Sequence, residues 1–171
     1  MKKWMVLAAA LGMASPALAQ REFCIKGAAV LNSSATPSFT WLVIQESSYY
    51  IKNTISFGYE TQFSYYAAGP DALSAGAGGN AYPIHIFLTS KVKIVRRGFL
   101  RPFLGAGIGV LAEVVNYPDH YAWNKSMAAQ VTAGISIGSG PGAAVQIEFR
   151  MMKADRPGFQ AKYLLVGGLA Y

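Results

Sequence analysis

The last stretch of the chain, Phe159-Gln-Ala-Lys-Tyr-Leu-Leu-Val-Gly-Gly-Leu-Ala-Tyr171, carries the pattern that decides the fold. Every second residue from Tyr171 back to Phe159 is apolar, aromatic or small, whereas Gln160 and Lys162 occupy the alternate positions. Because side chains alternate between the two faces of a strand, one face is apolar and has an aromatic ring at each end. The pattern predicts a strand that faces a membrane, with Tyr171 as an anchor at its end.

The other end of the chain has the composition of a secretory signal peptide. A lysine pair follows Met1, an apolar core extends over residues 4–13, and Ala17-Leu-Ala19 provides a small-x-small cleavage site. The apolar core is too short to cross ~30 Å of hydrocarbon as a helix. We therefore predict that residues 1–19 are removed and that residues 20–171 form a single domain.

The remaining chain is hydrophobic but has no apolar run long enough for a transmembrane helix. Hydrophobic residues make up 53% of the sequence and charged residues 13%, with a formal net charge of +7. Apolar character spread so evenly fits many short strands, and eight strands of about ten residues with their turns use this length. The sequence predicts an all-β fold, an eight-stranded antiparallel up-and-down transmembrane β-barrel. Cys24 is the single cysteine, so an intramolecular disulfide cannot form.

The alternation also predicts where the strands lie and how they face. Outward apolar rows are predicted at 23–31, 55–65, 82–94, 100–114, 131–137, 145–151 and 159–171. Residues 39–46 are apolar on both faces, so the facing of that strand stays open. We predict the first turn at Glu46–Tyr50 and exposed loops at Ala67–Ala81 and Asn116–Ser126. An even number of strands places both termini in the periplasm, together with tight turns at 96–98 and 138–142.

Two stretches resemble segments of small bacterial outer-membrane β-barrel proteins of the OmpA-like and OmpW-like kind. One is Arg101-Pro-Phe-Leu-Gly-Ala-Gly-Ile-Gly109, and the other is the closing strand that ends at Tyr171. The resemblance implies a location in the bacterial outer membrane and recognition of the closing strand by the barrel-assembly machinery. The alternating glycines independently predict a wall that neighbouring side chains crowd. A phosphate-binding loop is disfavoured here, because neither a helix nor Gly-Lys-Ser/Thr follows.

A soluble barrel of the lipocalin kind is the structural alternative, and it would place the apolar faces inside. The aromatic C-terminal residue, the aromatic residues near strand ends and the lack of Gly-x-Trp near the mature start favour the membrane barrel. In that case the inward faces carry many charges. These are Lys26, Lys52, Glu60, Lys91, Lys93, Arg101, Glu113, Glu148, Arg150 and Lys162. Because unpaired charges are costly in a narrow interior, we predict a network of internal ion pairs.

Candidates for chemistry are few. His120, Asp119 and Ser126 share one predicted loop and contain the residue types of a Ser-His-Asp site that could act on lipid A. His85 is predicted to face inward, but Phe87 stands where the barrel-shaped lipid A deacylases have a serine. Two histidines in separate regions make no metal site. We therefore predict no catalytic residues, no cofactor and no metal.

The sequence favours a non-catalytic structural or surface role in the cell envelope, by a monomer. A lipid A deacylase or acyltransferase is the alternative, and a narrow channel for small hydrophobic solutes is a third class. Nucleic acid is not an expected partner, because much of the positive charge alternates inward along strands. Exposed Lys125 and Arg156 are instead predicted to contact the phosphates of lipopolysaccharide.

Overall fold

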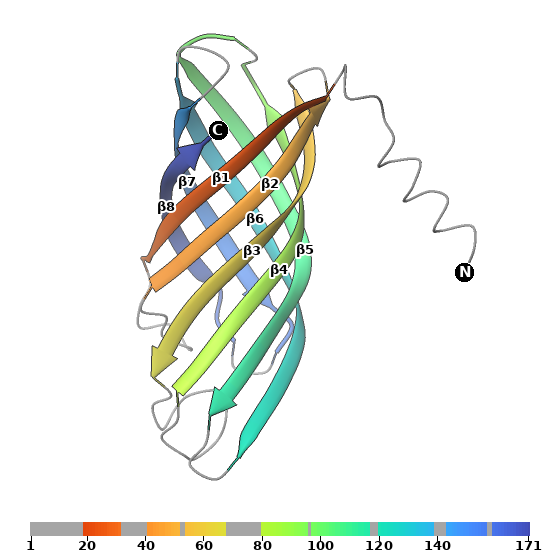
Figure 1. Cartoon of the computed structure of the whole chain (residues 1–171), viewed down its shortest axis with the longest axis vertical. Helices are drawn as coiled ribbons and strands as arrows, with labels where there is room; N and C mark the ends of the chain where they lie inside the picture. Colours follow the sequence, from red (N-terminus) through yellow and green to blue (C-terminus); the bar gives the residue numbers. More distant parts are fainter. Residues whose placement is uncertain are drawn as a thin grey trace, which may run out of the picture.

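The protein is an eight-stranded closed β-barrel, and its strands pair in chain order. The computed structural model describes residues 19–31, 41–51, 54–67, 80–95, 97–116, 120–138, 143–156 and 159–171. The predicted signal peptide, Lys52 and Asp119 lie outside these ranges, except for Ala19 at the start of the first strand. Among the described residues, no helix is long and apolar enough to cross a membrane. The strands are β1 (Ala19–Val30), β2 (Trp41–Ile51), β3 (Ile55–Ala67), β4 (Asn80–Lys93), β5 (Leu100–Asn116), β6 (Tyr121–Ile137), β7 (Ala144–Ala154) and β8 (Lys162–Ala170) (Figure 1).

The barrel closes where β1 and β8 meet. Residues Cys24–Val30 pair antiparallel with Leu164–Ala170. Beyond the last pair, the N–H of Tyr171 donates to the carbonyl of Phe23 over 2.8 Å, and the N–H of Phe23 donates to Tyr171 over 3.0 Å. Closure gives every strand two neighbours, which removes the free edges of an open sheet. The predicted fold class is confirmed.

The barrel has two distinct ends. The terminal end carries the start of β1, the end of β8 and the connections β2–β3, β4–β5 and β6–β7. At the β4–β5 connection Gly98 has a φ of 116°, a conformation that glycine adopts without strain. The opposite end, which we call the loop end, carries the other connections (Figure 1).

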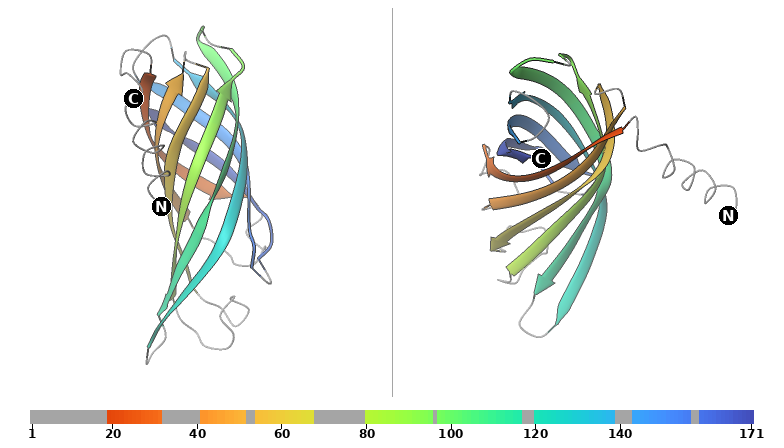
Figure 2. Two further views of the ribbon diagram at one scale, coloured as in Figure 1. Left: turned by 90° about the vertical axis from the view of Figure 1, so that its right-hand side faces the viewer. Right: turned by 45° about the horizontal axis from the view of Figure 1, so that its top comes forward.

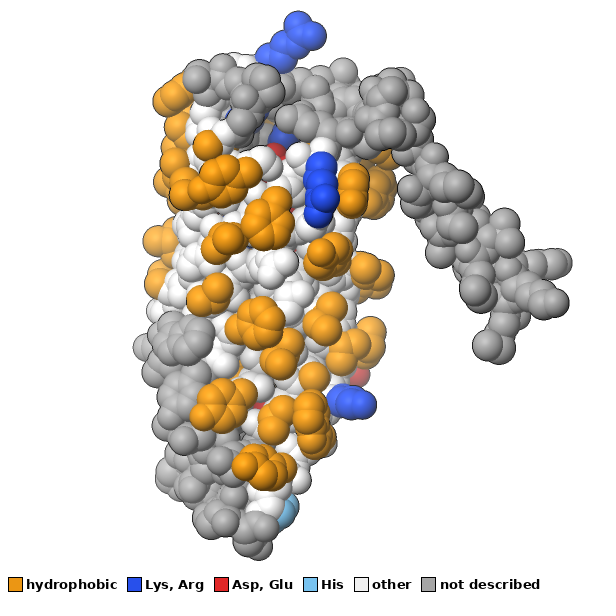
Figure 3. All heavy atoms as spheres, in the orientation of Figure 1, with side chains coloured by type: hydrophobic (Ala, Val, Ile, Leu, Met, Phe, Trp, Pro, Cys, Tyr) orange, Lys and Arg blue, Asp and Glu red, His pale blue; other side chains and the backbone are white. Residues whose placement is uncertain are grey.

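The polarity of the wall is the reverse of that in a soluble barrel. Along β7, buried and exposed residues alternate without a break. The exposed row contains Val145, Ile147, Phe149 and Met151, and the buried row contains Gln146, Glu148 and Arg150. Apolar side chains cover the visible outer wall in Figure 3. Such an arrangement is stable where the surroundings are hydrocarbon, and it rules out the lipocalin-like alternative.

Several exposed aromatic side chains lie near the two ends of the wall, and others, such as Tyr59 and Phe149, lie between them. The set near the loop end is Tyr82, Tyr121, Trp123 and Tyr163, and the set near the terminal end is Tyr49, Phe99 and Tyr171. Their rings combine an apolar body with a polar or polarisable edge and suit the two membrane–water interfaces. The two sets therefore mark the band of the barrel that crosses the membrane.

The prediction of a turn at Glu46–Tyr50 is wrong, because β2 continues to Ile51. Glu46, Ser48 and Tyr50 are buried and Tyr49 is exposed, as in a strand, although Ser47 is buried as well and interrupts strict alternation. Serine and glutamate suggested a turn, but they are equally suited to the polar interior of a barrel. The open question about residues 39–46 is answered in part, since Leu42 and Ile44 face inward.

The predicted loop at Asn116–Ser126 is also wrong. β6 begins at Tyr121, which pairs with Asn116 of β5, so the connection between the strands is short. β7 reaches only as far as Ala154, opposite Ala128 of β6. The β5–β6 hairpin therefore extends past the end of β7, as the left view of Figure 2 shows. The predicted loop at Ala67–Ala81 lies mostly outside the described residues; β3 ends at Ala67 and β4 begins at Asn80.

The alternating glycines of β5 face a crowded interior, as predicted. A Cβ atom at Gly107 would lie 3.2 Å from the side chain of Gln130, and one at Gly105 would lie 3.0 Å from Lys91. On β6, a Cβ atom at Gly134 would lie 2.7 Å from the ring of Phe103. Glycine at these positions leaves space inside the barrel that long side chains from neighbouring strands occupy.

Replacing Leu88 by arginine should destabilise the barrel, because Leu88 is 68% exposed near the middle of the outer face of β4. We expect Leu88→Arg to cost ~2–4 kcal/mol, the usual penalty for arginine at the bilayer midplane. The measurement is denaturant unfolding of the barrel refolded in phospholipid vesicles. Tyr121→Arg, at an exposed position beside the loop end, is the matched control and should cost about 0–1 kcal/mol. Equal stability of the two variants would contradict this assignment of the membrane band.

Candidate functional site

The predicted residues for chemistry do not come together. His120 is exposed immediately before β6, whereas Ser126 lies within β6 and pairs with Leu111 of β5. Six residues of extended strand correspond to about 20 Å, far beyond hydrogen-bond reach. Asp119 lies outside the described residues. The structure therefore separates the serine from the histidine that would have to activate it.

His85 is fully buried on the inner face of β4. Its ring stacks on that of Phe87, with 6.0 Å between centroids and an interplanar angle of 12°. Its direct strand partners are Gln62 and Leu111. Within the described part of the chain, no group of three His, Cys, Asp or Glu residues could hold a metal ion. His85 thus belongs to the packing of the interior.

Four charged side chains meet near the middle of the interior, one from each of β1, β2, β4 and β7. The ammonium group of Lys26 lies 2.5 Å from a carboxylate oxygen of Glu46 and 2.5 Å from one of Glu148. Lys91 contacts the same two carboxylates at 2.6 Å and 3.4 Å. All four side chains are buried. Lys26–Glu46 joins the neighbouring strands β1 and β2, whereas the other three ion pairs join strands that are not neighbours in the sheet and so brace the barrel across its lumen.

Arg150 extends this network toward β3 and β6. Its guanidinium lies 2.5 Å from Glu148 and 2.7 Å from Glu60. Gln62 and Gln130 also donate to Glu60, over 2.6 Å and 2.9 Å. Each carboxylate therefore has several donors, which a buried ion needs to offset its lost hydration.

The central network is electrically balanced. It joins the carboxylates of Glu46, Glu60 and Glu148 with the cations Lys26, Lys91 and Arg150. Balance matters here because the interior has no bulk water to screen an unpaired charge. The predicted internal ion pairs are confirmed. Glu46 was missing from the prediction, because the alternation in β2 was mistaken for a turn.

Smaller charged contacts lie toward each end of the interior. Near the terminal end, Lys93 lies 3.3 Å from Glu22, to which Gln146 also donates over 3.0 Å. Near the loop end, Arg156 forms an ion pair with Glu113. Most of the charges predicted to face inward are buried, Arg101 is only partly buried, and Lys52 lies outside the described residues.

Toward the loop end, the interior has more apolar side chains, although Glu113 and Lys162 are also buried there. The apolar side chains form one cluster of Leu42, Ile44, Phe87, Leu111, Ala128, Met152, Ala154, Phe159, Leu164 and Val166. We call this set the apolar plug. Phe159 was predicted to face lipid, and that prediction is wrong, since the residue is 5% exposed. β8 begins only at Lys162, and a turn in which the N–H of Phe159 donates to Arg156 directs its ring inward.

Among the described residues, the space found beside the central network is small. The gap next to Glu60, Lys91 and Thr132 is too small for a water molecule. The apolar plug covers the network on the loop side, with its aromatic and aliphatic members almost fully buried. An eight-stranded interior is just wide enough for side chains to fill, and here they fill it.

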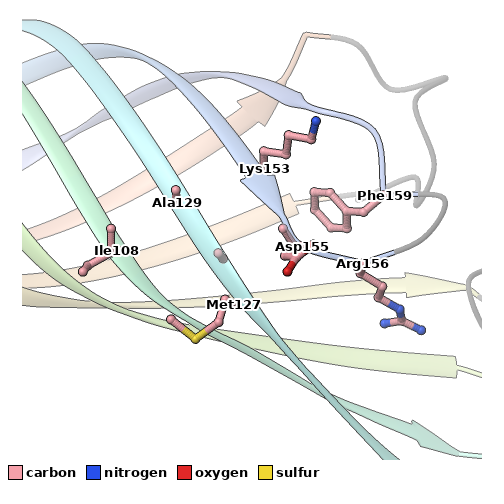
Figure 4. A pocket seen from close by; sticks show the side chains of 9 residues that line it. Ile108, Met127, Ala129, Lys153, Asp155, Arg156 and Phe159 are labelled. Atoms are coloured by element: carbon pink, nitrogen blue, oxygen red, sulfur yellow. The ribbon is translucent and has the colours of Figure 1, made fainter.

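An open groove lies on the outside of the wall, where β7 ends and β6 continues. It has a volume of about 760 Å³ and is lined by Ile108, Met127, Ala128, Ala129, Lys153, Ala154, Asp155, Arg156 and Phe159. Figure 4 shows Ile108 and Met127 on the β5–β6 side, Lys153 at the end of β7, and Asp155 and Arg156 just beyond that strand. The N–H of Asp155 donates to the carbonyl of Met127 over 2.7 Å and fixes that segment to β6.

No protein-family model and no curated protein matches the chain. Among solved structures, the N-terminal β-barrel domain of Pseudomonas aeruginosa OprF is similar, with a TM-score of 0.63 and 12% identity over 88% of this chain and 94% of that one. Neisserial surface protein A is similar with a TM-score of 0.55 and 14% identity, over 89% of this chain and 91% of that one. The resemblance to small outer-membrane barrels is thus confirmed at the level of the fold.

Removing one charge from the central network should be costly, because its former partners stay buried. We expect Glu148→Gln and Arg150→Gln each to lower the free energy of unfolding by ~3–5 kcal/mol. The double variant keeps the network neutral, so it should cost less than the sum of the two, with a coupling energy of ~0.5–3 kcal/mol. The measurement is a double-mutant cycle by denaturant unfolding in vesicles.

The control for this cycle combines Glu148→Gln with Arg101→Gln. Arg101 is only partly buried and contacts Ser136, at 3.4 Å, rather than the central network. The effects of this second pair should add. Additivity in both cycles would mean that the network does not act as a unit.

Proposed function

We propose that the protein is a plugged, non-catalytic barrel of the bacterial outer membrane with a structural or surface-interaction role. The observation that carries this proposal is the filled interior, ionic at the centre and apolar toward the loop end. A barrel filled in this way offers its outer wall and its loop end to other molecules. The protein then acts through contacts that its outer wall makes in the membrane and that its loop end makes at the cell surface.

The proposed location follows from the wall and from the fold. The exposed apolar band lies between two sets of aromatic side chains, and the fold is shared with two outer-membrane barrels. Outer-membrane barrels have short periplasmic turns and longer extracellular loops. We therefore place the terminal end in the periplasm and the loop end outside the cell, following secretion with a cleaved signal peptide.

The alternatives receive less support. A lipid A deacylase or acyltransferase needs a serine or another nucleophile beside its base, and Ser126 lies about 20 Å along β6 from His120. A channel for hydrophobic solutes needs an open path, and the apolar plug is packed. Neither alternative has an observation of its own in its favour.

Two measurements separate the three functional classes. We expect the purified barrel in planar bilayers to leave the conductance at background, because the central network and the apolar plug fill the lumen. We also expect cells that express the protein to have lipid A of unchanged mass, and His120→Ala to make no difference. Steady conductance would establish a channel, and a shift in lipid A mass that His120→Ala abolishes would establish the enzyme.

We propose further that the barrel-assembly machinery recognises the closing strand through Tyr171. Its ring is 58% exposed, and its backbone pairs with Phe23 at the seam where the barrel closes. An exposed aromatic ring at the periplasmic interface is available both to lipid and to a folding catalyst.

Changing Tyr171 should therefore reduce assembly in a way that depends on the ring. Tyr171→Ser is expected to lower the fraction of heat-modifiable protein in the outer membrane several-fold, whereas Tyr171→Phe keeps the ring and should assemble nearly as well as wild type. The measurement is the ratio of folded to total protein on gels run without and with boiling. Efficient assembly of Tyr171→Ser would remove the proposed role of the closing strand.

A further inference from the structure

The groove beside the end of β7 combines two kinds of surface. Ile108 and Met127 are 64% and 57% exposed and belong to the outer, membrane-facing rows of β5 and β6. Ala154 and Phe159 belong to the buried apolar plug. The groove therefore leads from the membrane-facing wall to the edge of the plug, and its floor is apolar throughout.

One lysine, Lys153, lines this groove on the membrane-facing side, and a second, Lys125, lies outside it further along β6. Lys153 ends the outer row of β7, and Lys125 lies on the same face of β6, one position beyond Met127 in the outward row. Both are exposed, and neither forms an ion pair within the part of the chain that the structure describes. Since Lys153 pairs with Ala129, the two lysines are offset by four residues of strand, about 13 Å.

The third cation, Arg156, differs from these two lysines. Its guanidinium is paired with the buried carboxylate of Glu113. Asp155 supplies the one carboxylate on the rim of the groove. The charge that remains available for a ligand is therefore positive and belongs to the lysines.

We propose that this groove binds an anionic, phosphate-bearing lipid of the outer leaflet, with an acyl chain on the apolar floor and the headgroup phosphate at Lys153, on the side of Lys125. The volume of about 760 Å³ lies within the range of ligand sites that bury most of a small molecule. An anionic headgroup supplies the partner that both ammonium groups lack. An exposed lysine near an anionic membrane surface contributes about 1 kcal/mol to such an interaction, roughly fivefold in affinity.

The position of the groove favours a lipid over a protein partner. Its lining rows continue the membrane-facing rows of β5, β6 and β7 without interruption, so lipid chains are its immediate surroundings. A second copy of the chain would bring Lys125 and Lys153 of both copies to the same face, and like charges repel. The proposal rests on the membrane location given under the proposed function, but not on the absence of conductance or catalysis.

The test measures which lipid lies beside Trp123, which is 65% exposed on β6, one position beyond Lys125 in the outward row. The full-length mature chain with Trp41→Phe is refolded into phosphatidylcholine vesicles that contain a minor fraction of brominated lipid. The brominated lipid is phosphatidic acid in one arm and phosphatidylcholine in the other. Quenching of Trp123 reports the local enrichment of each, and we expect phosphatidic acid to be enriched about tenfold or more.

Two variants tie this enrichment to the groove. Lys153→Gln should lower the preference for phosphatidic acid about fivefold. Ala129→Phe places a ring on the floor of the groove and should reduce the quenching of Trp123 by both brominated lipids. Ala133→Phe is the matched control, because it lies four residues along the same outward row of β6, outside the groove. Heat-modifiability of each variant verifies that the barrel is folded. If Ala129→Phe does not fold, the conservative surface change Lys153→Gln still tests whether the groove selects the anionic lipid.

Three outcomes would overturn the proposal. They are equal quenching by the two brominated lipids in the unaltered groove, a preference that survives Lys153→Gln, and an effect of Ala133→Phe as large as that of Ala129→Phe. A dimer in sedimentation measurements that Ala129→Phe dissociates would assign the groove to a second copy instead. None of these results bears on conductance or lipid A mass, so the proposed function stands or falls separately.

Discussion

The placement of Lys26 between Glu46 and Glu148 is the interaction on which the rest of the interior depends. Its ammonium group lies 2.5 Å from both carboxylates, which come from β2 and β7 on either side of β1 and β8. Backbone pairing alone joins only neighbouring strands, whereas this contact fixes strands across the lumen. Buried ion pairs add little net stability compared with apolar packing, but they make any unbalanced arrangement costly. The network thus selects one arrangement of the interior.

The change from an ionic centre to an apolar plug explains why a binding groove can form at the loop end of the barrel. The central charges are buried and engaged with one another, so they are not exposed to a ligand from outside. Apolar packing toward the loop end needs no such pairing, and it tolerates a gap where β7 ends before β6 does. A groove can therefore form beside Phe159 without exposing the central network to water.

The sequence alone determined the fold and the facing of most strands, because strict alternation has a single interpretation in a closed barrel. It failed where polar residues continue a strand. Glu46 was assigned to a turn, and Ser126 was assigned to a loop, although both lie within strands. The predicted facing of Phe159 was wrong for another reason. Alternation predicts the facing of a side chain only inside a strand, and β8 starts three residues after Phe159. The groove could not be predicted, since it arises from the relative lengths of β6 and β7.

The difference in strand length also links the groove to the membrane. β6 has 17 residues and β7 has 11, so the outer row of β7 ends at Lys153 while that of β6 continues past Met127 to Lys125 and Trp123. An ammonium group that ends an apolar row lies at the depth where hydrocarbon meets headgroups. Lys153 is such a group, and together with the apolar floor beside it matches the headgroup and the acyl chain of a phospholipid. The difference in length between β6 and β7 therefore creates both the apolar floor of the groove and the lysine at its edge.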